Sequence, residues 1–166
     1  HYSSRRQRQM CIRDRSLVNA CKDGQDLDAR WNMMMASTEG AMAFSKGLGA
    51  VHSMSHAIGA NQELRLHHGT LNGVILPTVI RFNKDHVGDK LPRILRAMGK
   101  SESADLADEI EKFNEKINLP SGLKEMGVTE EMIPELVEHS ITDPSNVTTP
   151  RLPSPEEWEQ LFLSAM

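Results

Sequence analysis

Apolar residues follow a helical rhythm along most of this chain. Beyond residue 15 they recur at steps of three and four positions, and glycine or proline interrupts each run. This pattern predicts helices over residues 27–44, 50–58, 68–82, 87–98, 103–117, 129–137 and 154–162. No convincing strand and no βαβ pattern occurs. The sequence therefore predicts an all-α fold, a multi-helix bundle.

Several helix boundaries carry clear local signals. Asp26 is placed to cap the first helix of this series. The last helix has Ser154 as its cap, followed by Pro155 and Glu157, which predicts a capping box. Pro77 should kink or divide the helix that contains it. The polar, proline-rich stretch 142–153 is predicted to be a loop.

Methionines gather in the helix predicted over residues 27–44, at positions 33–35 and 42. Their thioethers could form a soft-metal site. Helical spacing favours core packing instead, because methionine is a flexible side chain that fills gaps. We therefore predict that they are buried.

The first fifteen residues differ in charge from the rest of the chain. They hold five arginines and one aspartate, a net charge of +4, which leaves −8 for the remainder of a chain whose total is −4. This basic head could be an arm that binds nucleic acid. It has no apolar periodicity, so we interpret residues 1–15 as a disordered or artefactual tail and residues 16–166 as one helical domain. The acidic body argues against a nucleic-acid surface.

Nothing in the sequence indicates a membrane protein or a secreted one. The longest uncharged apolar stretch, residues 71–80, is far short of the ~20 residues that span a bilayer. No secretory signal pattern opens the chain. Cys11 and Cys21 form no disulfide framework and fit no zinc motif, so we expect a cytoplasmic protein. No G-x-G-x-x-G occurs, so the chain has no dinucleotide-binding module of its own.

Four histidines lie within one short segment: His52, His56, His67 and His68. His52 and His56 are four residues apart, hence on one face of a helix. That spacing can bring two imidazoles to one metal, or one to a metal and the other to its substrate. Ser53 stands where zinc proteases of the H-E-x-x-H type have their glutamate, which disfavours that chemistry. Each histidine alone would more often be a hydrogen-bonded structural residue.

The segment around these histidines resembles a known signature. Residues 47–83 read GLGAVHSMSHAIGANQELRLHHGTLNGVILPTVIRFN. They are similar to the pattern G-L-G-x-x-H-x-x-x-H-x-x-G, a variable loop and H-G-x-x-N-x-x-x-L-P of iron-containing (group III) alcohol dehydrogenases. The matching positions are Gly47, Leu48, Gly49, His52, His56, Gly59, His68, Gly69, Asn72, Leu76 and Pro77. A looser resemblance covers about residues 16–166 and includes the ending NVTTPRLPSPEEWEQLF.

The resemblance implies a metal site and a reaction. In that family an Asp and three His hold Fe2+, sometimes Zn2+, and two of these histidines correspond to His52 and His68. His56 corresponds to a non-ligating histidine beside the metal and the nicotinamide, so it is the expected catalytic and cofactor-binding residue, able to relay a proton. His67 is expected to support the site or have a structural part. The substrate would be a small alcohol or aldehyde, and the full-length protein a homo-oligomer.

The sequence departs from the family pattern in two places. The family's amino-terminal domain binds NAD or NADP through a G-G-G-S loop, and its helical half opens with a D-x-x-x-H that supplies two metal ligands. Neither motif occurs here. We therefore expect a fragment with little or no dehydrogenase activity, and exposed apolar surface where the other half docks. The alternative is a non-enzymatic helical metal-binding or interaction module with His52, His56 and His68 as ligands.

Overall fold

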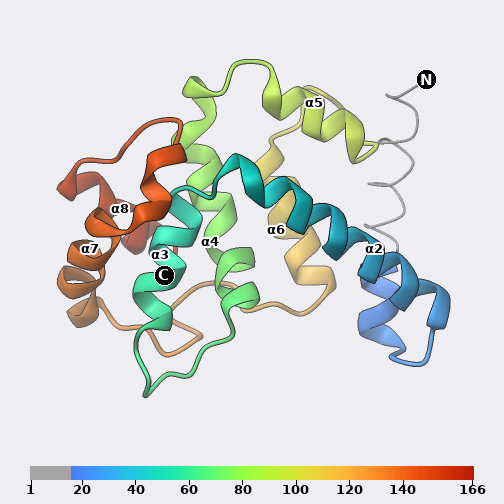
Figure 1. Ribbon diagram of the computed structural model, residues 1–166, viewed down its shortest axis with the longest axis horizontal. Helices are drawn as coiled ribbons and strands as arrows, with labels where there is room; N and C mark the ends of the chain where they lie inside the picture. The colour runs from blue at the N-terminus through green and yellow to red at the C-terminus, as the bar shows by residue number, and fades with distance from the viewer. Residues whose placement is uncertain (1–15) are drawn as a thin grey trace.

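The computed structural model describes residues 16–166, which form helices joined by turns and loops (Figure 1). The α-helices are α2 (Leu27–Ala43), α3 (Ala50–Gly59), α4 (His68–Asn83), α5 (Lys90–Ala97), α6 (Leu106–Lys116), α7 (Ile133–Thr142) and α8 (Pro155–Ser164). Short 3-10 turns are η1 (Phe44–Lys46), η2 (Lys84–His86), η3 (Glu130–Met132) and η4 (Pro144–Thr148). Residues 16–22 are also helical, and residues 16–166 contain no strand, so the all-α prediction is confirmed.

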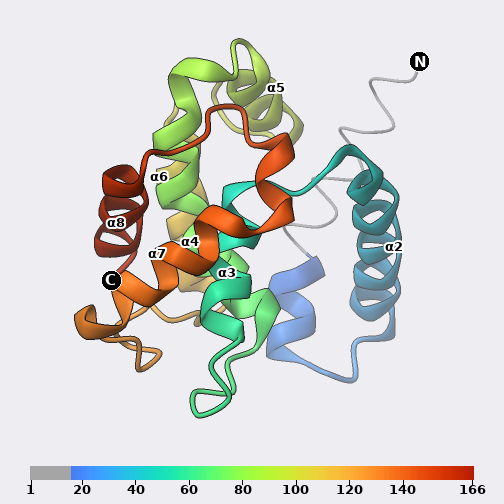
Figure 2. The same cartoon turned by 60° about the vertical axis from the view of Figure 1, so that its left-hand side comes forward.

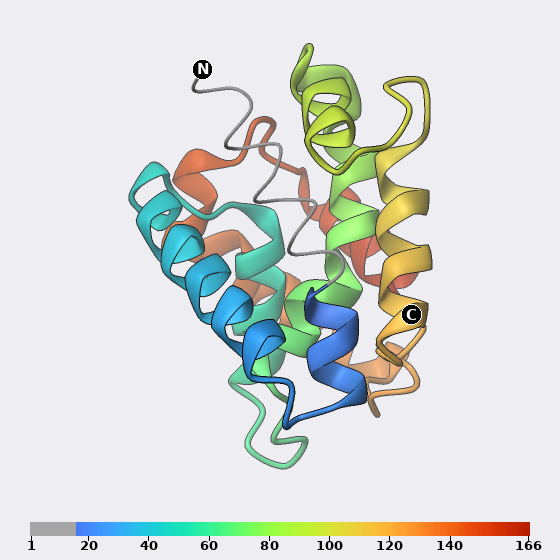
Figure 3. The same ribbon diagram turned by 90° about the vertical axis from the view of Figure 1, so that its right-hand side faces the viewer.

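The main core lies among α3, α4, α7 and α8. Helix α3 packs on α4 and α7, and α8 packs on α7 and α4. Trp158, Phe162, Met54 and Leu71 are fully buried there. A smaller apolar cluster joins α5 to α6, and α6 runs beside α4 (Figure 3). Burial of these apolar side chains is the main driving force for the bundle.

Helix α4 continues through Pro77 as one element, so Pro77 does not divide it. The other expected outcome, a kink at Pro77, stays a prediction. A proline at position 77 has no N–H to donate to the carbonyl of Gly73, one turn earlier. The side chain of Asn114 in α6 donates to that carbonyl instead, with Nδ2 2.8 Å from the oxygen. Glycine at position 73 permits the approach, because a Cβ there would lie 2.8 Å from the side chain of Leu119. The neighbouring helix thus satisfies the group that proline leaves unpaired.

Helix α2 stands apart from the bundle, on the side away from α8 (Figure 2). It does not pack against α3–α8 to the extent that these helices pack on one another. The prediction that its methionines are core is therefore wrong for Met34 and Met42, which are 66% and 73% exposed, and for Met35. Leu27 and Trp31 on α2 are also exposed. This apolar stripe is exposed surface of the kind that the resemblance implies.

The two predicted caps are present. Oδ1 of Asp26 accepts from the backbone N–H of Ala29 at 2.9 Å. Ser154 and Glu157 form the reciprocal capping box of α8. These local motifs fix where their helices begin.

Two other expectations concern the amino-terminal tail and the absence of membrane-spanning helices. The predicted tail, residues 1–15, lies outside the described residues. In the part that the structure describes, no helix has the length and hydropathy needed to cross a bilayer.

Candidate metal centre

The candidate centre lies where α3 and α4 meet. His52 and His56 are on α3, one turn apart, and His68 is the first residue of α4. His67 caps α4, because its Nδ1 accepts from the backbone N–H of Thr70 at 3.3 Å. His67 therefore has a structural role: it fixes the start of α4 and, with it, the position of His68.

The structure brings the three remaining histidine rings together. The ring centroids of His52 and His68 are 5.2 Å apart. The ring of His56 stacks on that of His68 at 5.3 Å, with 17° between their planes, and lies 5.7 Å from His52. Helices separated by the loop of residues 60–67 thus contribute to one cluster of imidazoles. The role of its members as ligands stays a prediction.

The imidazoles of His52 and His68 aim at a common point. Nδ2 of Asn72, one turn into α4, lies 3.5 Å from Nε2 of His52 and 3.1 Å from Nε2 of His68. An amide NH2 group only donates hydrogen bonds, so both Nε2 atoms direct a lone pair at Asn72. Two imidazole nitrogens with lone pairs directed at one place are suited to share a divalent ion. Oδ1 of Asn72 is buried, and no described residue hydrogen-bonds to it.

A hydroxyl orients the ring of His68. Oγ of Ser55 lies 3.1 Å from the carbonyl oxygen of His52, to which it donates, and 3.4 Å from Nδ1 of His68. With its own proton used, the hydroxyl accepts from Nδ1–H of His68. That leaves the lone pair on Nε2 of His68, on the side of Asn72. A second hydrogen bond that fixes tautomer and direction is typical of metal-binding histidines.

Both candidate ligands favour the neutral form. Burial lowers the pKa of His52, and the nearby His68 and His56 lower it further, against an opposing effect of Asp143. The pKa of His68 is lowered by burial, then by His56 and His67. A metal binds only the neutral imidazole, so these shifts favour metal binding near neutral pH.

Acidification is expected to destabilise the fold as the pH falls below 6.5. Unfolded histidines titrate at the ordinary pKa of 6.5, whereas His52 and His68 in the folded chain titrate below it. In the pH range between the folded and the unfolded pKa, the unfolded state binds more protons than the folded state. The free energy of unfolding therefore increases as the pH rises and decreases on acidification. Urea denaturation at pH values from about 8 to 5 measures this slope, above the range where most carboxylates titrate.

Two variants identify the groups that cause this pH dependence of the free energy of unfolding. In the double variant His52→Gln, His68→Gln, the free energy of unfolding should depend less on pH between 6.5 and roughly 5. His86→Gln, at an exposed position, should keep the slope of the original chain. An unchanged slope in the double variant would assign the pH dependence to other groups.

The loop predicted over residues 142–153 also contributes to the site. It contains η4 and folds against the start of α3, where the backbone N–H of Gly49 donates to the carbonyl of Ser145 at 2.9 Å. Oδ2 of Asp143 lies 2.9 Å from Nδ1 of His56, and the Asp143 side chain is only 13% exposed. Asp143 was not among the residues predicted from the sequence. The only local signal was an acidic residue before Pro144 at a helix end, which is too common to assign a role.

The described residues do not complete a metal site by themselves. Within residues 16–166 no group of three or more histidine, cysteine or acidic side chains is arranged to hold an ion. His52 and His68 are thus a pair.

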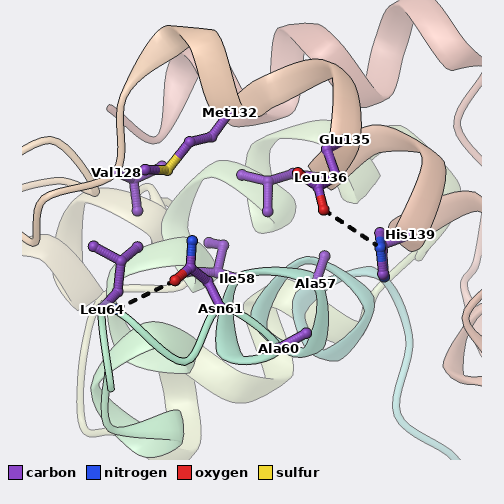
Figure 4. Close-up of a pocket in the computed structure, with 10 residues that line it drawn as sticks. All are labelled: Ala57, Ile58, Ala60, Asn61, Leu64, Val128, Met132, Glu135, Leu136 and His139. Carbon is purple, nitrogen blue, oxygen red and sulfur yellow. Dashed lines mark hydrogen bonds and ion pairs between the residues drawn. The ribbon is translucent and has the colours of Figure 1, made fainter.

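A cavity of about 170 Å³ lies between α3 and α7, and His52, His56 and His68 are not among the residues that line it (Figure 4). Mostly apolar side chains line it, among them Ile58, Leu64 and Leu136. Nε2 of His139 lies 4.0 Å from Oε1 of Glu135 along its lining. Neither His52 nor His68 lines it, so this cavity is no part of the candidate centre.

Known proteins resemble this chain along nearly its whole length. Residues 8–166 match the Fe-containing alcohol dehydrogenase family, C-terminal. The 4-hydroxybutyrate dehydrogenase of Cupriavidus necator is 42% identical over an alignment of 157 residues, and the match covers 90% of this chain and 41% of that protein. The 1,3-propanediol dehydrogenase of Citrobacter freundii is 32% identical over 91% of this chain and 41% of its own length. The chain thus spans well under half the length of these relatives.

Solved structures agree with the sequence match. The crystal structure of a 1,3-propanediol oxidoreductase superposes with a TM-score of 0.87 at 30% identity, over 95% of this chain and 44% of that one. The alcohol dehydrogenase from Oenococcus oeni gives the same TM-score at 25% identity, over 100% of this chain and 46% of its own. Fold, signature and family match lead to one conclusion: this chain belongs to the Fe-containing alcohol dehydrogenase family and corresponds to its C-terminal, all-helical part.

Proposed function

We propose that this chain forms the metal-binding part of an NAD(P)-linked oxidoreductase that interconverts alcohols with aldehydes or ketones by hydride transfer. The observation that carries the proposal is the convergence of Nε2 of His52 and Nε2 of His68 on Asn72. The family match supports iron as the metal, with zinc as the alternative. The bound ion would act as a Lewis acid on the substrate oxygen.

The side chains of this chain have distinct parts in that reaction. His52 and His68 offer neutral imidazole nitrogens to the ion. His56 lies beside both rings, and its side chain is 41% exposed, so it can pass a proton between the site and solvent. We propose that His56 also contacts the nicotinamide, and that NAD or NADP is bound mainly by sequence outside these 166 residues.

The substrate is proposed to be a small alcohol or its carbonyl product. The relatives include enzymes named 4-hydroxybutyrate dehydrogenase, 1,3-propanediol dehydrogenase and lactaldehyde reductase. These substrates share a short chain and a hydroxyl or carbonyl group. We further propose a cytoplasmic location and a homo-oligomeric full-length protein, with no nucleic acid and no membrane as partner.

Metal titration of this chain tests the proposal. Calorimetry with Zn2+, and with Fe2+ under anaerobic conditions, should detect one weakly bound ion per chain, because His52 and His68 supply only two ligands. His52→Ala and His68→Ala should each weaken binding at least about tenfold, because each removes one direct ligand. His139→Ala, at an exposed position, should bind as the original chain does.

Two outcomes oppose the proposal. Absence of saturable binding would contradict a metal centre at this site. A loss of affinity in His56→Ala as large as that in His52→Ala would make His56 a ligand and favour the non-enzymatic three-histidine module.

A further inference from the structure

We propose that Asp143 is a positioning residue that sets the tautomer and direction of the His56 imidazole. The inference rests on the proposed function, since it assigns His56 its working form. Asp143 is 87 residues from His56 in sequence, and its Oδ2 lies 2.9 Å from Nδ1 of that histidine. Among residues 16–166, no carboxylate nearer to His56 in sequence makes this contact.

The carboxylate of Asp143 is held in place on its other side. Its Oδ1 accepts from the backbone N–H of Ser145 at 2.7 Å, as the cap of η4. One oxygen therefore anchors the carboxylate and the other faces His56. The side chain is 13% exposed, so little water competes for the second oxygen.

The loop that carries Asp143 is itself tied to α3. Oγ of Ser53 donates to Oδ1 of Asn146 at 2.7 Å, and Nδ2 of Asn146 donates to the carbonyl of Ser140 at 2.6 Å. Gly49 N–H donates to the carbonyl of Ser145. Because the same helix carries His56, the carboxylate and the imidazole are fixed relative to each other.

The chemistry of a carboxylate then determines the tautomer. An ionised carboxylate only accepts hydrogen bonds, so Nδ1 of His56 must carry the proton of this contact. Burial opposes ionisation of Asp143, but hydrogen bonds from Ser145 and His56 outweigh it and lower its pKa. In the neutral ring the lone pair is therefore on Nε2. That nitrogen is the one available to take up a proton during the reaction.

The alternative is that His56 needs no partner. Its side chain is 41% exposed, and an exposed imidazole exchanges between tautomers and rotamers. Without a fixed partner, His56 would have its free lone pair on Nε2, in the required direction, in only part of the molecules. Asp143 removes this freedom before the substrate arrives, which is the sense in which it positions His56.

The test is nitrogen-15 NMR of the His56 ring in the full 166-residue chain, at about pH 8.5, where an ordinary imidazole is neutral. In the original chain the Nδ1–H tautomer should exceed the other by roughly tenfold or more, because a hydrogen bond to a charged acceptor is strong. Asp143→Asn keeps an oxygen to cap Ser145 but presents an amide donor to Nδ1. The ratio should fall roughly tenfold in that variant.

Two further variants make the result decisive. Asp143→Ser retains a cap but is too short to reach His56, so it should also lose the Nδ1–H preference, and it decides the matter should the asparagine variant lose its fold. Asp105→Asn changes the cap of α6, which accepts from Ala107 and Asp108 and contacts no histidine in this way. It should leave the His56 ratio unchanged.

Zinc titration of the same samples separates this inference from the proposed function. If the original chain binds zinc and the tautomer ratio is the same in both Asp143 variants, the positioning role is contradicted and the metal centre is not. If the original chain binds no zinc, the proposed function fails whatever the ratio is. Zinc affinity should remain within about threefold in Asp143→Asn, because the side chain of Asp143 is hydrogen-bonded to His56, which is not a proposed ligand.

Discussion

Replacing Trp158 with alanine is expected to lower the free energy of unfolding by about 3–5 kcal/mol. Trp158 is fully buried in the core that joins α8 to α3, α4 and α7. Removing its indole deletes a large apolar contact area and leaves a cavity that helices of this length cannot fill. Urea denaturation followed by circular dichroism at pH 8 measures the change.

The same helix supplies a matched control. Leu163 is 37% exposed, and Leu163→Ala should change the free energy of unfolding by much less, at most about 1 kcal/mol. Equal losses in the two variants would mean that α8 does not dock on the bundle through Trp158. The orientation of the histidine helices would then need another source of support.

Asn72→Asp is expected to raise zinc affinity by roughly 100-fold, which equals about 2.7 kcal/mol. The amide nitrogen of Asn72 lies 3.5 Å from Nε2 of His52 and 3.1 Å from Nε2 of His68. A carboxylate at this place would add a third, negatively charged ligand of a kind that zinc accepts. Calorimetric titration of the purified chain gives the ratio of affinities.

Asn72→Leu separates the new ligand from the loss of the amide. Leucine has a similar volume and no donor or acceptor, so zinc affinity should stay close to that of the original chain. An equal gain in both variants would show that the amide only obstructs the two imidazoles. No gain in Asn72→Asp would place the point of convergence elsewhere.

The parts of the fold that depend on local signals could be predicted from the sequence. The cap at Asp26, the capping box of α8 and the glycine-bounded helix α3 all occur where short-range patterns placed them. The parts that failed depend on distant partners. Helix α4 survives Pro77 because Asn114 of another helix reaches the free carbonyl, and α2 leaves its methionines exposed because the bundle does not cover them.

The candidate site divides in the same way. The H-x-x-x-H spacing predicts that His52 and His56 lie on one helix face, and the family signature predicts that His68 lies near them. The ring distances show that the three imidazoles are close together. Asp143 could not be predicted, because its meeting with His56 depends on a loop that folds back across 87 residues. The position of Asn72 between two Nε2 atoms likewise depends on how α3 and α4 cross.

The central claim is that the Nε2 atoms of His52 and His68 bind one divalent ion. Crystals of the chain grown with zinc, and diffraction data measured at the zinc absorption edge, test it most directly. The account predicts one anomalous peak about 2.0–2.1 Å from both Nε2 atoms, with Asn72 displaced from its present contacts. A peak bound to only one of these histidines, or separate peaks on each, would contradict it.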